Sequence, residues 1–373
     1  MLTQNNINTT GEKVLKQSKG MPSVSIVTLR DTPEVSYVYK RASDSFTPEA
    51  IIIAVAAAKI SKLLLGDHAV DSDLVVDEGN KPVGILSLFI TPHARQHHNG
   101  EGDSRPEDHP LLLSRTFGKQ LAVAYCLEDD DAHIENFIKN SEGQLIRIDT
   151  DFSFIRFLSR KGYVLDSKMA RVDGFELSDE ILAQFPFDPD YKCTGLPKAW
   201  IGNDYLLHRA YQNLHPELQE EFIAGIREGF EIFKALTLKP QELSSSITPA
   251  FCKHKVLLAE FMAYLSQRIE AIQAANLDTI ASRHSLVPLE VCRSISNAST
   301  AVGFGSPSTD PIADNRPAII VSPLAIGLPS ASPAPPEIQP SLGRGVTPQQ
   351  ALAAFHVITS TASGQLPATL QNP

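Results

Sequence analysis

The side chains best suited to chemistry lie between residues 129 and 154, where aspartates, a histidine and an asparagine follow one another closely. Asp131, His133 and Asn136 form the pattern D-x-H-x-x-N, and Asp149 comes 13 residues after the asparagine. Carboxylate and carboxamide oxygens hold hard cations, and a carboxylate can also accept the proton of an attacking hydroxyl. Together with a lysine that neutralises phosphate, these are the groups that phosphoryl transfer requires. The pattern therefore predicts a site that acts on phosphate groups.

These residues can meet only if a helix, a loop and a hairpin place them together. Residues 111–127 predict a helix, and residues 136–149 predict a short hairpin with Asn-Ser-Glu-Gly as its turn. Asp131 then lies in the loop after the helix, and the hairpin begins at the asparagine and ends at the second aspartate. The acidic run 128–130 is interpreted as a solvated helix end that raises the local affinity for metal.

The stretch DAHIEN…IRIDTDFSF resembles the D-R-H-x-x-N…H-I-D-F-G pair shared by phosphatidylinositol kinases and HipA-like protein kinases. It is also similar to the I-D-x-D-x-S-F variant of kinase-like effectors that intracellular bacteria secrete. The resemblance implies that Asp131 is the catalytic aspartate. It further implies that Asn136 and Asp149 are ligands of Mg²⁺ (or Mn²⁺) and that the nucleotide is ATP. His133 belongs to the same catalytic loop, where it is expected to support the loop or to touch the terminal phosphate and not to act as the base.

Two positions in this stretch depart from the family pattern. Ala132 stands where the family has arginine, and Thr150-Asp151 stands where phenylalanine and glycine follow the metal aspartate. An alternative alignment makes Asp151-Phe152-Ser153 the D-F-G equivalent. The 13-residue spacing favours Asp149 as the metal aspartate, with Asp151 as a second metal ligand.

The elements upstream follow the order of the same superfamily, β-β-α-β-β, over residues 23–90. Lys40 ends the second strand of a hairpin, where the resemblance implies a lysine that holds the α- and β-phosphates. Glu49 begins a buried helix and is the candidate ion-pair partner of this lysine, although the helix dipole alone favours a glutamate there. A hinge is expected near residues 87–90. The sequence before Lys40 contains no glycine-rich loop, so a degenerate kinase, an enzyme that needs an activator, or a related transfer such as adenylylation or glutamylation stays open.

The predicted fold class is α+β: a two-lobed kinase-like fold with a β-rich N-lobe, a helical C-lobe and a disordered Pro/Ser-rich C-terminal tail. The chain divides into a flexible N-terminus, the N-lobe, the C-lobe, and the tail with a short terminal helix: residues 1–20, 21–90, 91–293 and 294–373. Two amphipathic helices are expected in the C-lobe, at residues 216–236 and 255–275, separated by residues 240–250.

Composition narrows the class of protein. The net charge of −10 argues against a nucleic-acid binder, which would present a basic face. The four cysteines form no CxxC pair, which is typical of reduced thiols in a cytosolic protein. The longest apolar run, residues 50–58, is too short to cross a bilayer, and the polar N-terminus does not resemble a signal peptide. We expect a cytosolic protein, and the resemblance to effectors implies secretion by a bacterium into a host cell.

The leading hypothesis is an ATP- and Mg²⁺-dependent phosphotransferase with ATP between the two lobes. The acceptor is either a protein hydroxyl or a phosphoinositide, and the protein is favoured because the stretch after Asp149 lacks a basic cluster for an inositol headgroup. The alternatives are a pseudokinase, whose tail and terminal helix dock on a partner protein, and an adenylyltransferase-like effector that moves AMP from the same nucleotide site.

Overall fold

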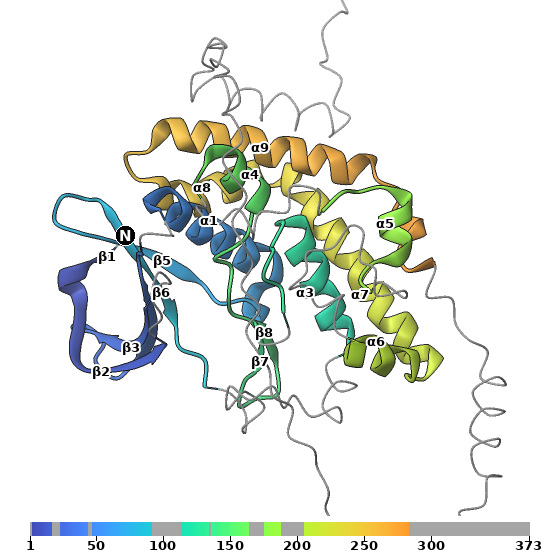
Figure 1. Cartoon of the computed structure of the whole chain (residues 1–373), viewed down its shortest axis with the longest axis horizontal. Coiled ribbons are helices and arrows are strands. Elements are labelled where there is room, and N and C mark those ends of the chain that lie inside the picture. The colour runs from blue at the N-terminus through green and yellow to red at the C-terminus, as the bar shows by residue number, and fades with distance from the viewer. Residues whose placement is uncertain are drawn as a thin grey trace, which may run out of the picture. The chain divides into compact units, whose positions relative to one another are not determined.

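The structure is a computed structural model of the chain. It describes residues 2–16, 23–43, 47–91, 113–133, 136–163, 175–187 and 205–282. All of these residues belong to the first of the two units into which the chain divides. The architecture is α+β, as predicted: a curled β-sheet forms the N-terminal lobe, and helices form the C-terminal region (Figure 1). The expected tail and its terminal helix lie outside the described residues.

Within the described residues, six strands form the sheet of the N-terminal lobe in the order β1-β5-β6-β4-β3-β2. They are β1 (Leu2–Thr3), β2 (Ile7–Lys16), β3 (Val24–Leu29), β4 (Ser36–Arg41), β5 (Ser72–Val76) and β6 (Pro82–Leu88). The predicted hairpin is confirmed as the antiparallel pair β3–β4, and the second predicted pair is confirmed as β5–β6.

The sheet curls because its two edge strands follow each other directly in the chain. Only the 3-10 turn η1 (Gln4–Asn6) separates β1 from β2, which lie on opposite edges. A flat sheet of this size would hold its edges about 24 Å apart, whereas the link spans at most about 14 Å. The interior of the curl is a small core made of Ile7, Val27, Tyr39, Val75 and Leu86.

The sequence-based prediction that the first 20 residues are flexible is wrong for residues 2–16, which form β1, η1 and β2. Ile7 is the only apolar residue of this segment in the interior of the curl that is buried, and most of the other positions are polar. The strands therefore form through their hydrogen-bonded neighbours and not through an apolar alternation that the sequence would reveal.

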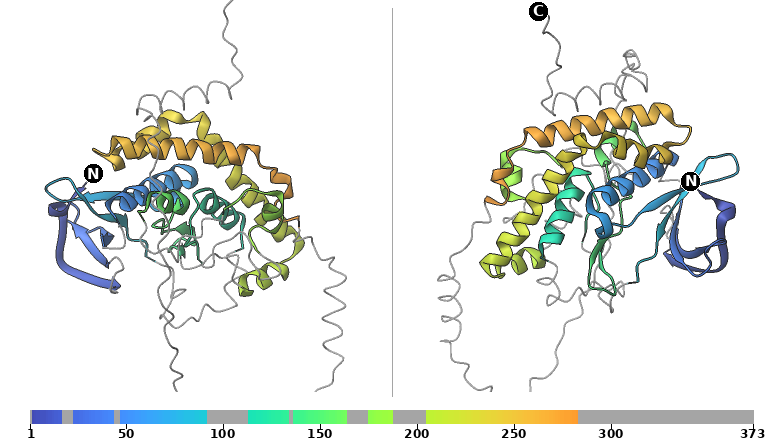
Figure 2. Two further views of the ribbon diagram at one scale, coloured as in Figure 1. Left: turned by 45° about the horizontal axis from the view of Figure 1, so that its top comes forward. Right: turned by 180° about the vertical axis from the view of Figure 1, so that it is seen from behind.

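Helix α1 (Pro48–Leu65) is the central element between the sheet and the C-terminal helices (Figure 2). The Thr47 hydroxyl accepts a hydrogen bond from the Ala50 N–H at 3.2 Å, and Gly66 ends the helix at φ +59°. Twelve of its eighteen residues are buried, because one side packs on β5 and β6 and another packs on α8 (Pro240–Phe251). The helix is therefore fixed on more than one face.

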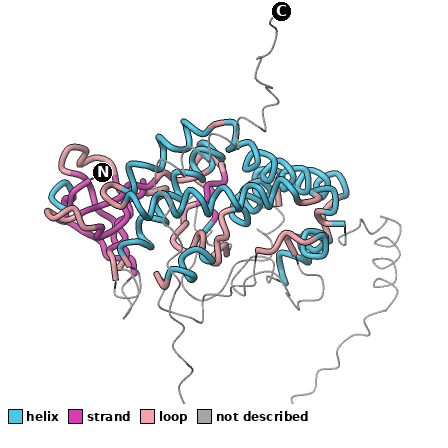
Figure 3. Tube along the Cα trace, turned by 90° about the horizontal axis from the view of Figure 1, so that it is seen from above, coloured by secondary structure: helices cyan, strands magenta, loops and turns pink. Residues whose placement is uncertain are grey.

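The C-terminal region consists of helices around a short hairpin, and most of the strands gather at the other end of the described structure (Figure 3). Beside α8, the helices are α3 (Arg115–Cys126), α4 (Ile155–Lys161), α5 (Asp179–Gln184), α6 (Tyr205–Gln212), α7 (Pro216–Lys234) and α9 (Lys255–Ala274). The hairpin is β7 (Phe137–Lys139) with β8 (Leu145–Arg147), and the 3-10 turns η2 (Gly66–His68), η6 (Ala235–Leu238) and η7 (Leu277–Thr279) connect elements. The segment that separates the two long predicted helices is itself helical, as α8. None of the described helices is long and apolar enough to span a membrane.

Helices α3 and α7 make close backbone contact through glycines. A Cβ atom on Gly225 would lie 2.0 Å from the backbone oxygen of Arg115, and one on Gly118 would lie 2.3 Å from that of Phe222. Neither backbone oxygen can move aside without displacing its helix. The contact matters for the site because α3 leads into the loop that carries Asp131.

Replacing Gly225 with alanine is expected to lower the free energy of unfolding by about 3 kcal/mol. The loss should occur although alanine favours an isolated helix over glycine by about 1 kcal/mol, because the new methyl group overlaps the α3 backbone. Denaturant unfolding of purified G225A would measure it. The matched control is R227A on the exposed side of α7, for which a change within about 0.5 kcal/mol is expected; equal stability of the two variants would contradict the prediction.

Candidate active site

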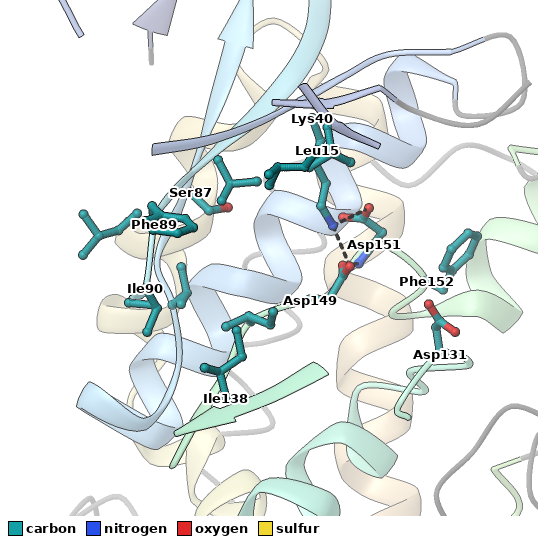
Figure 4. A pocket seen from close by; sticks show the side chains of 15 residues that line it. Leu15, Lys40, Ser87, Phe89, Ile90, Asp131, Ile138, Asp149, Asp151 and Phe152 are labelled. Carbon is teal, nitrogen blue, oxygen red and sulfur yellow. Dashed lines mark hydrogen bonds and ion pairs between the residues drawn. The ribbon is translucent and has the colours of Figure 1, made fainter. Parts of the chain in front are cut away.

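A cavity of about 350 Å³ lies between the curled sheet and the β7–β8 hairpin, within the size range of small-molecule sites. One end is mainly apolar and includes Phe89 and Ile90, which follow β6, at the position expected for a hinge (Figure 4). The other end holds the charged side chains of Lys40, Asp149 and Asp151, with Asp131 at its margin. The cavity thus offers an apolar slot beside a charged cluster.

Lys40 crosses from the sheet to the loop after β8 and meets two carboxylates there (Figure 4). Its Nζ donates to Asp149 Oδ2 at 2.6 Å and to Asp151 Oδ2 at 2.8 Å. The Asp151 N–H donates to Asp149 Oδ1 at 3.1 Å, so the loop folds both side chains toward the same nitrogen. Lys40 therefore joins the sheet to two aspartates that lie 109 and 111 positions later in the sequence.

The charges in this cluster are set by burial and by one another. Burial opposes ionisation of Asp149, but the charge and hydrogen bond of Lys40 outweigh it and lower the pKa of Asp149 to about 2. Burial and the neighbouring charge of Asp149 raise the pKa of Asp151 to about 7, although Lys40 favours its ionised form. Burial disfavours the Lys40 ammonium, and the two carboxylates outweigh burial and raise the pKa of Lys40. At neutral pH, Asp149 is ionised and Lys40 is protonated, while Asp151 loses its proton less readily than an isolated aspartate does.

The loop that carries Asp131 is tied together by its own polar groups. Asn136 Nδ2 donates to the Asp131 carbonyl oxygen at 2.6 Å, and the His133 N–H donates to the same oxygen at 2.8 Å. His133 Nε2 lies 3.6 Å from Asp131 Oδ2. The Asn136 carbonyl accepts from the Ile148 N–H at 3.0 Å, which places this residue beside the strand end that leads to Asp149. The structure therefore holds the predicted D-x-H-x-x-N residues together in one loop beside the end of β8, and of these three only Asp131 lines the cavity.

The Lys40–Glu49 ion pair considered from the sequence is not formed in this structure. The lysine is already bound by two carboxylates, while Glu49 stands in the first turn of α1, where the helix dipole favours it. Together with burial, which is the larger cause, the charge of Glu49 raises the pKa of Tyr163, after α4. Glu49 thus faces Tyr163, and it is not among the residues that line the cavity.

The donor set at the charged end fits a hard divalent cation. Asp149 and Asp151 approach a single nitrogen closely enough to share one ion. Asn136, whose Nδ2 is bound to the Asp131 carbonyl, does not line the cavity, so its part in holding an ion stays a prediction. Oxygen-only sets of this kind suit Mg²⁺ or Mn²⁺. Among the residues that the structure describes, no three or more His, Cys, Asp or Glu side chains gather into a group that could hold a metal ion, and the cluster at Lys40 contributes two carboxylates.

The interpretation of residues 128–130 as a solvated acidic end is wrong for Glu128 and Asp129, which are fully or almost fully buried. Tyr264 donates to Glu128 Oε2 at 2.5 Å, and Asp129 forms a buried ion pair with Arg147. The chain turns inward because Glu128 adopts a left-handed conformation at φ +52°. Burial raises the pKa of Asp129 although Arg147 opposes that rise.

Sequence reasoning missed the roof of the cavity, which Leu15 and Val24 contribute from β2 and β3. The register explains how Leu15 arrives there: Val14 pairs with Ser25 and Lys16 pairs with Val24, so Leu15 is the extra residue of a β-bulge. Bulges redirect side chains next to binding sites. The signal in the sequence is one apolar pair, Val14-Leu15, within an otherwise polar segment.

Comparisons with known proteins give structural similarity alone. No family model matches the chain, and no curated protein matches its sequence. Many solved structures resemble parts of it, and three of them are described. The Mycobacterium tuberculosis PknI kinase domain is 16% identical with a TM-score of 0.27, over 41% of this chain and 64% of that domain. The Helicobacter pylori proinflammatory kinase CtkA is 14% identical with a TM-score of 0.35, over 75% and 96% of the two chains. Cex1p is 13% identical with a TM-score of 0.32, over 79% of this chain and 54% of the Cex1p chain. The chemistry of this chain therefore has to be inferred from its own side chains.

Proposed function

We propose that this chain is an ATP- and Mg²⁺-dependent phosphotransferase of divergent kinase fold that phosphorylates a protein hydroxyl. The observation that carries the proposal is the convergence of Lys40 with Asp149 and Asp151 at one end of the cavity that Asp131 also lines. A cation, two acidic side chains that can hold metal, and a separate carboxylate near the opening are the groups that phosphoryl transfer uses.

In the proposed mechanism, Asp131 orients the acceptor hydroxyl and takes its proton, and its side chain is 35% exposed, which leaves it accessible to an acceptor. His133 supports this carboxylate from 3.6 Å. Asn136 and Asp149, with Asp151 as a further ligand, would hold the metal, which neutralises charge on the β- and γ-phosphates when bound. The apolar end of the cavity would take the adenine ring.

In the proposal, Lys40 changes partners when nucleotide binds. It now neutralises Asp149 and Asp151, and the α- and β-phosphates would take over its charge while the metal takes over the carboxylates. This exchange keeps every buried charge compensated. Glu49 does not take part in this exchange. Its proposed role in nucleotide binding is limited to stabilising the first turn of α1.

The loop after β8 that carries Asp149 and Asp151 is proposed to hold the metal and is called the metal loop here. A protein acceptor is favoured over a phosphoinositide by the contacts of the basic residues that follow this loop. On α4, Lys161 pairs with Glu260 at 2.7 Å, Arg156 lies 3.7 Å from Glu128, and Arg160 stacks 5.9 Å from the Tyr264 ring. These cations are therefore already engaged by groups of the chain. The effector role, including secretion into a host cell, is proposed on the resemblance of the I-D-x-D-x-S-F stretch.

The test uses the full chain and its Asp149→Ala variant, each incubated with Mg²⁺ and ATP labelled at the γ- or the α-phosphate. We expect label from γ-labelled ATP on the wild type alone, on itself or on added host-cell protein. Label from α-labelled ATP would instead support adenylylation. Calorimetry completes the test: Mg²⁺-dependent ATP binding without transfer, even with candidate host metabolites present as activators, would support a pseudokinase, and no binding would reject a nucleotide site.

A further inference from the structure

A buried ion pair lies directly beneath the candidate active site. Arg147, at the end of β8, and Asp129, after α3, each expose only 1% of their surface. Nη2 of the arginine binds Oδ2 of the aspartate, and Nη1 donates to Ser61 Oγ of α1 at 2.8 Å. Nη2 also approaches Ser153 Oγ, after the metal aspartates, at 3.5 Å. One guanidinium thus touches three separate parts of the fold.

The aspartate of this pair holds the backbone of Asp131. Its second oxygen, Oδ1, accepts from the Asp131 N–H at 3.1 Å, while the Asp131 carbonyl accepts from Asn136 Nδ2 at 2.6 Å. The peptide groups on both sides of Asp131 are therefore fixed, one by the buried pair and one by a proposed metal ligand. A shift of Asp129 would be passed to Asp131 across two residues.

The arginine of the pair connects the same loop to α1. Its carbonyl accepts from the Val70 N–H at 3.0 Å, just before β5, and Thr150 Oγ1 donates to the Ala54 carbonyl of α1 at 3.1 Å. Helix α1 is thus held against the metal loop at Ser61 and Ala54. It is held there without an ion pair between Lys40 and Glu49.

We propose that the Asp129–Arg147 pair is the positioning device of this site, which fixes Asp131 relative to the metal loop and to α1. The inference rests on the proposed function, in which Asp131 acts on the acceptor. The alternative is a purely structural pair. Buried ion pairs gain little stability over apolar residues of similar volume, because desolvation offsets their attraction. Geometry is what this pair supplies: a guanidinium can bind several oxygens in fixed directions, which an apolar side chain or a lysine cannot do.

A double-variant cycle separates the two roles. Asp129→Leu and Arg147→Met alone each leave one buried charge unpaired, and each should lower Tm by about 10 °C. The D129L/R147M double variant has no buried charge and should recover Tm to within about 3 °C of the wild type. Its kcat should nevertheless remain about 100-fold low, with KM for ATP nearly unchanged, because Asp131 has lost its support while the nucleotide site has not.

Recovery of both Tm and kcat in the double variant would overturn the inference, since the pair would then be structural only. A double variant as unstable as the single variants would overturn it as well, because the pair would be holding the fold and not the site. The conservative variant R147K should keep Tm but lose kcat, since one ammonium cannot reach both serines.

Hydrogen exchange at the His133 and Asn136 amides gives a measurement that does not depend on activity. Both amides bond within the Asp131 loop, so faster exchange in the double variant is expected if the pair positions that loop. Faster exchange together with an inactive wild type would reject the proposed function and keep the positioning role. Unchanged exchange would reject the positioning role itself.

Discussion

Replacing Asp149 with asparagine is expected to lower kcat/KM for ATP about 1000-fold or more. The substitution keeps the size of the side chain but removes the carboxylate that binds Lys40 at 2.6 Å and that we propose as the main metal ligand. The fold should survive, because Lys40 keeps its contact with Asp151 at 2.8 Å. Steady-state phosphoryl transfer at saturating Mg²⁺, compared with Tm, would separate the two effects.

The same variant has a second, independent readout. Loss of the Asp149 charge removes repulsion that raises the pKa of Asp151 and leaves Lys40 to that carboxylate alone, so the pKa of Asp151 should fall well below 7. An NMR titration of the Asp151 carboxyl carbon would measure the change. A pKa that stays near 7 in D149N would show that the two side chains do not share the lysine in solution.

Asp151→Asn is the matched control, because it removes the other carboxylate of the same cluster and keeps the Lys40–Asp149 pair. Because Asp151 is proposed as a second ligand, D151N should lower kcat/KM by about 10- to 100-fold, which is a smaller loss than that expected for D149N. A larger loss in D151N than in D149N would reverse this assignment and support the alignment that makes Asp151-Phe152-Ser153 the D-F-G equivalent.

Replacing Asp131 with asparagine is expected to lower kcat by about 10²- to 10⁴-fold, the range for loss of a positioned general base. KM for ATP should change little, since Asp131 lies at the margin of the cavity and does not contact Lys40 in the described structure (Figure 4). Stability should change by less than about 0.5 kcal/mol, because the side chain is 35% exposed. Single-turnover kinetics of γ-phosphoryl transfer would isolate the chemical step.

The comparison variant for Asp131 is H133A, which removes the neighbour at 3.6 Å and leaves the carboxylate in place. It should lose about tenfold, as a supporting group whose removal loosens but does not remove the base. Equal kcat in D131N and the wild type would mean that the acceptor proton goes elsewhere. A greater loss in H133A than in D131N would transfer the role of base to the histidine.

The sequence could predict the elements whose local signals agree with their tertiary environment. Helix α1 has a threonine cap, a proline in its first turn and a glycine at its end, and all three act in the structure as expected. The hairpin between Asn136 and Asp149 could also be predicted, because its two strands and its turn have local sequence signals. Local chemistry was sufficient in both cases.

The other features of the fold and of the candidate site depend on contacts between residues that are far apart in the sequence. Nothing near Glu128 or Asp129 in sequence shows that Tyr264 and Arg147 will enclose them, so a solvated acidic run was the simpler interpretation. Lys40 could reach a glutamate or an aspartate, and only the fold of the loop after β8 decides in favour of Asp149 and Asp151. Long-range ion pairs leave no periodic signal in the sequence.

At the bulge, Leu15 lines the cavity without taking part in the pairing of β2 with β3, so that the loss of this residue would affect the two properties differently. A regular strand that loses one residue reverses the direction of every later side chain, whereas loss of Leu15 would leave Val14 and Lys16 free to pair in sequence with Ser25 and Val24. The ladder would become more regular, and the roof of the cavity would lose its side chain. Deletion of Leu15 would therefore preserve the pairing of β2 with β3 and remove one side chain from the cavity lining.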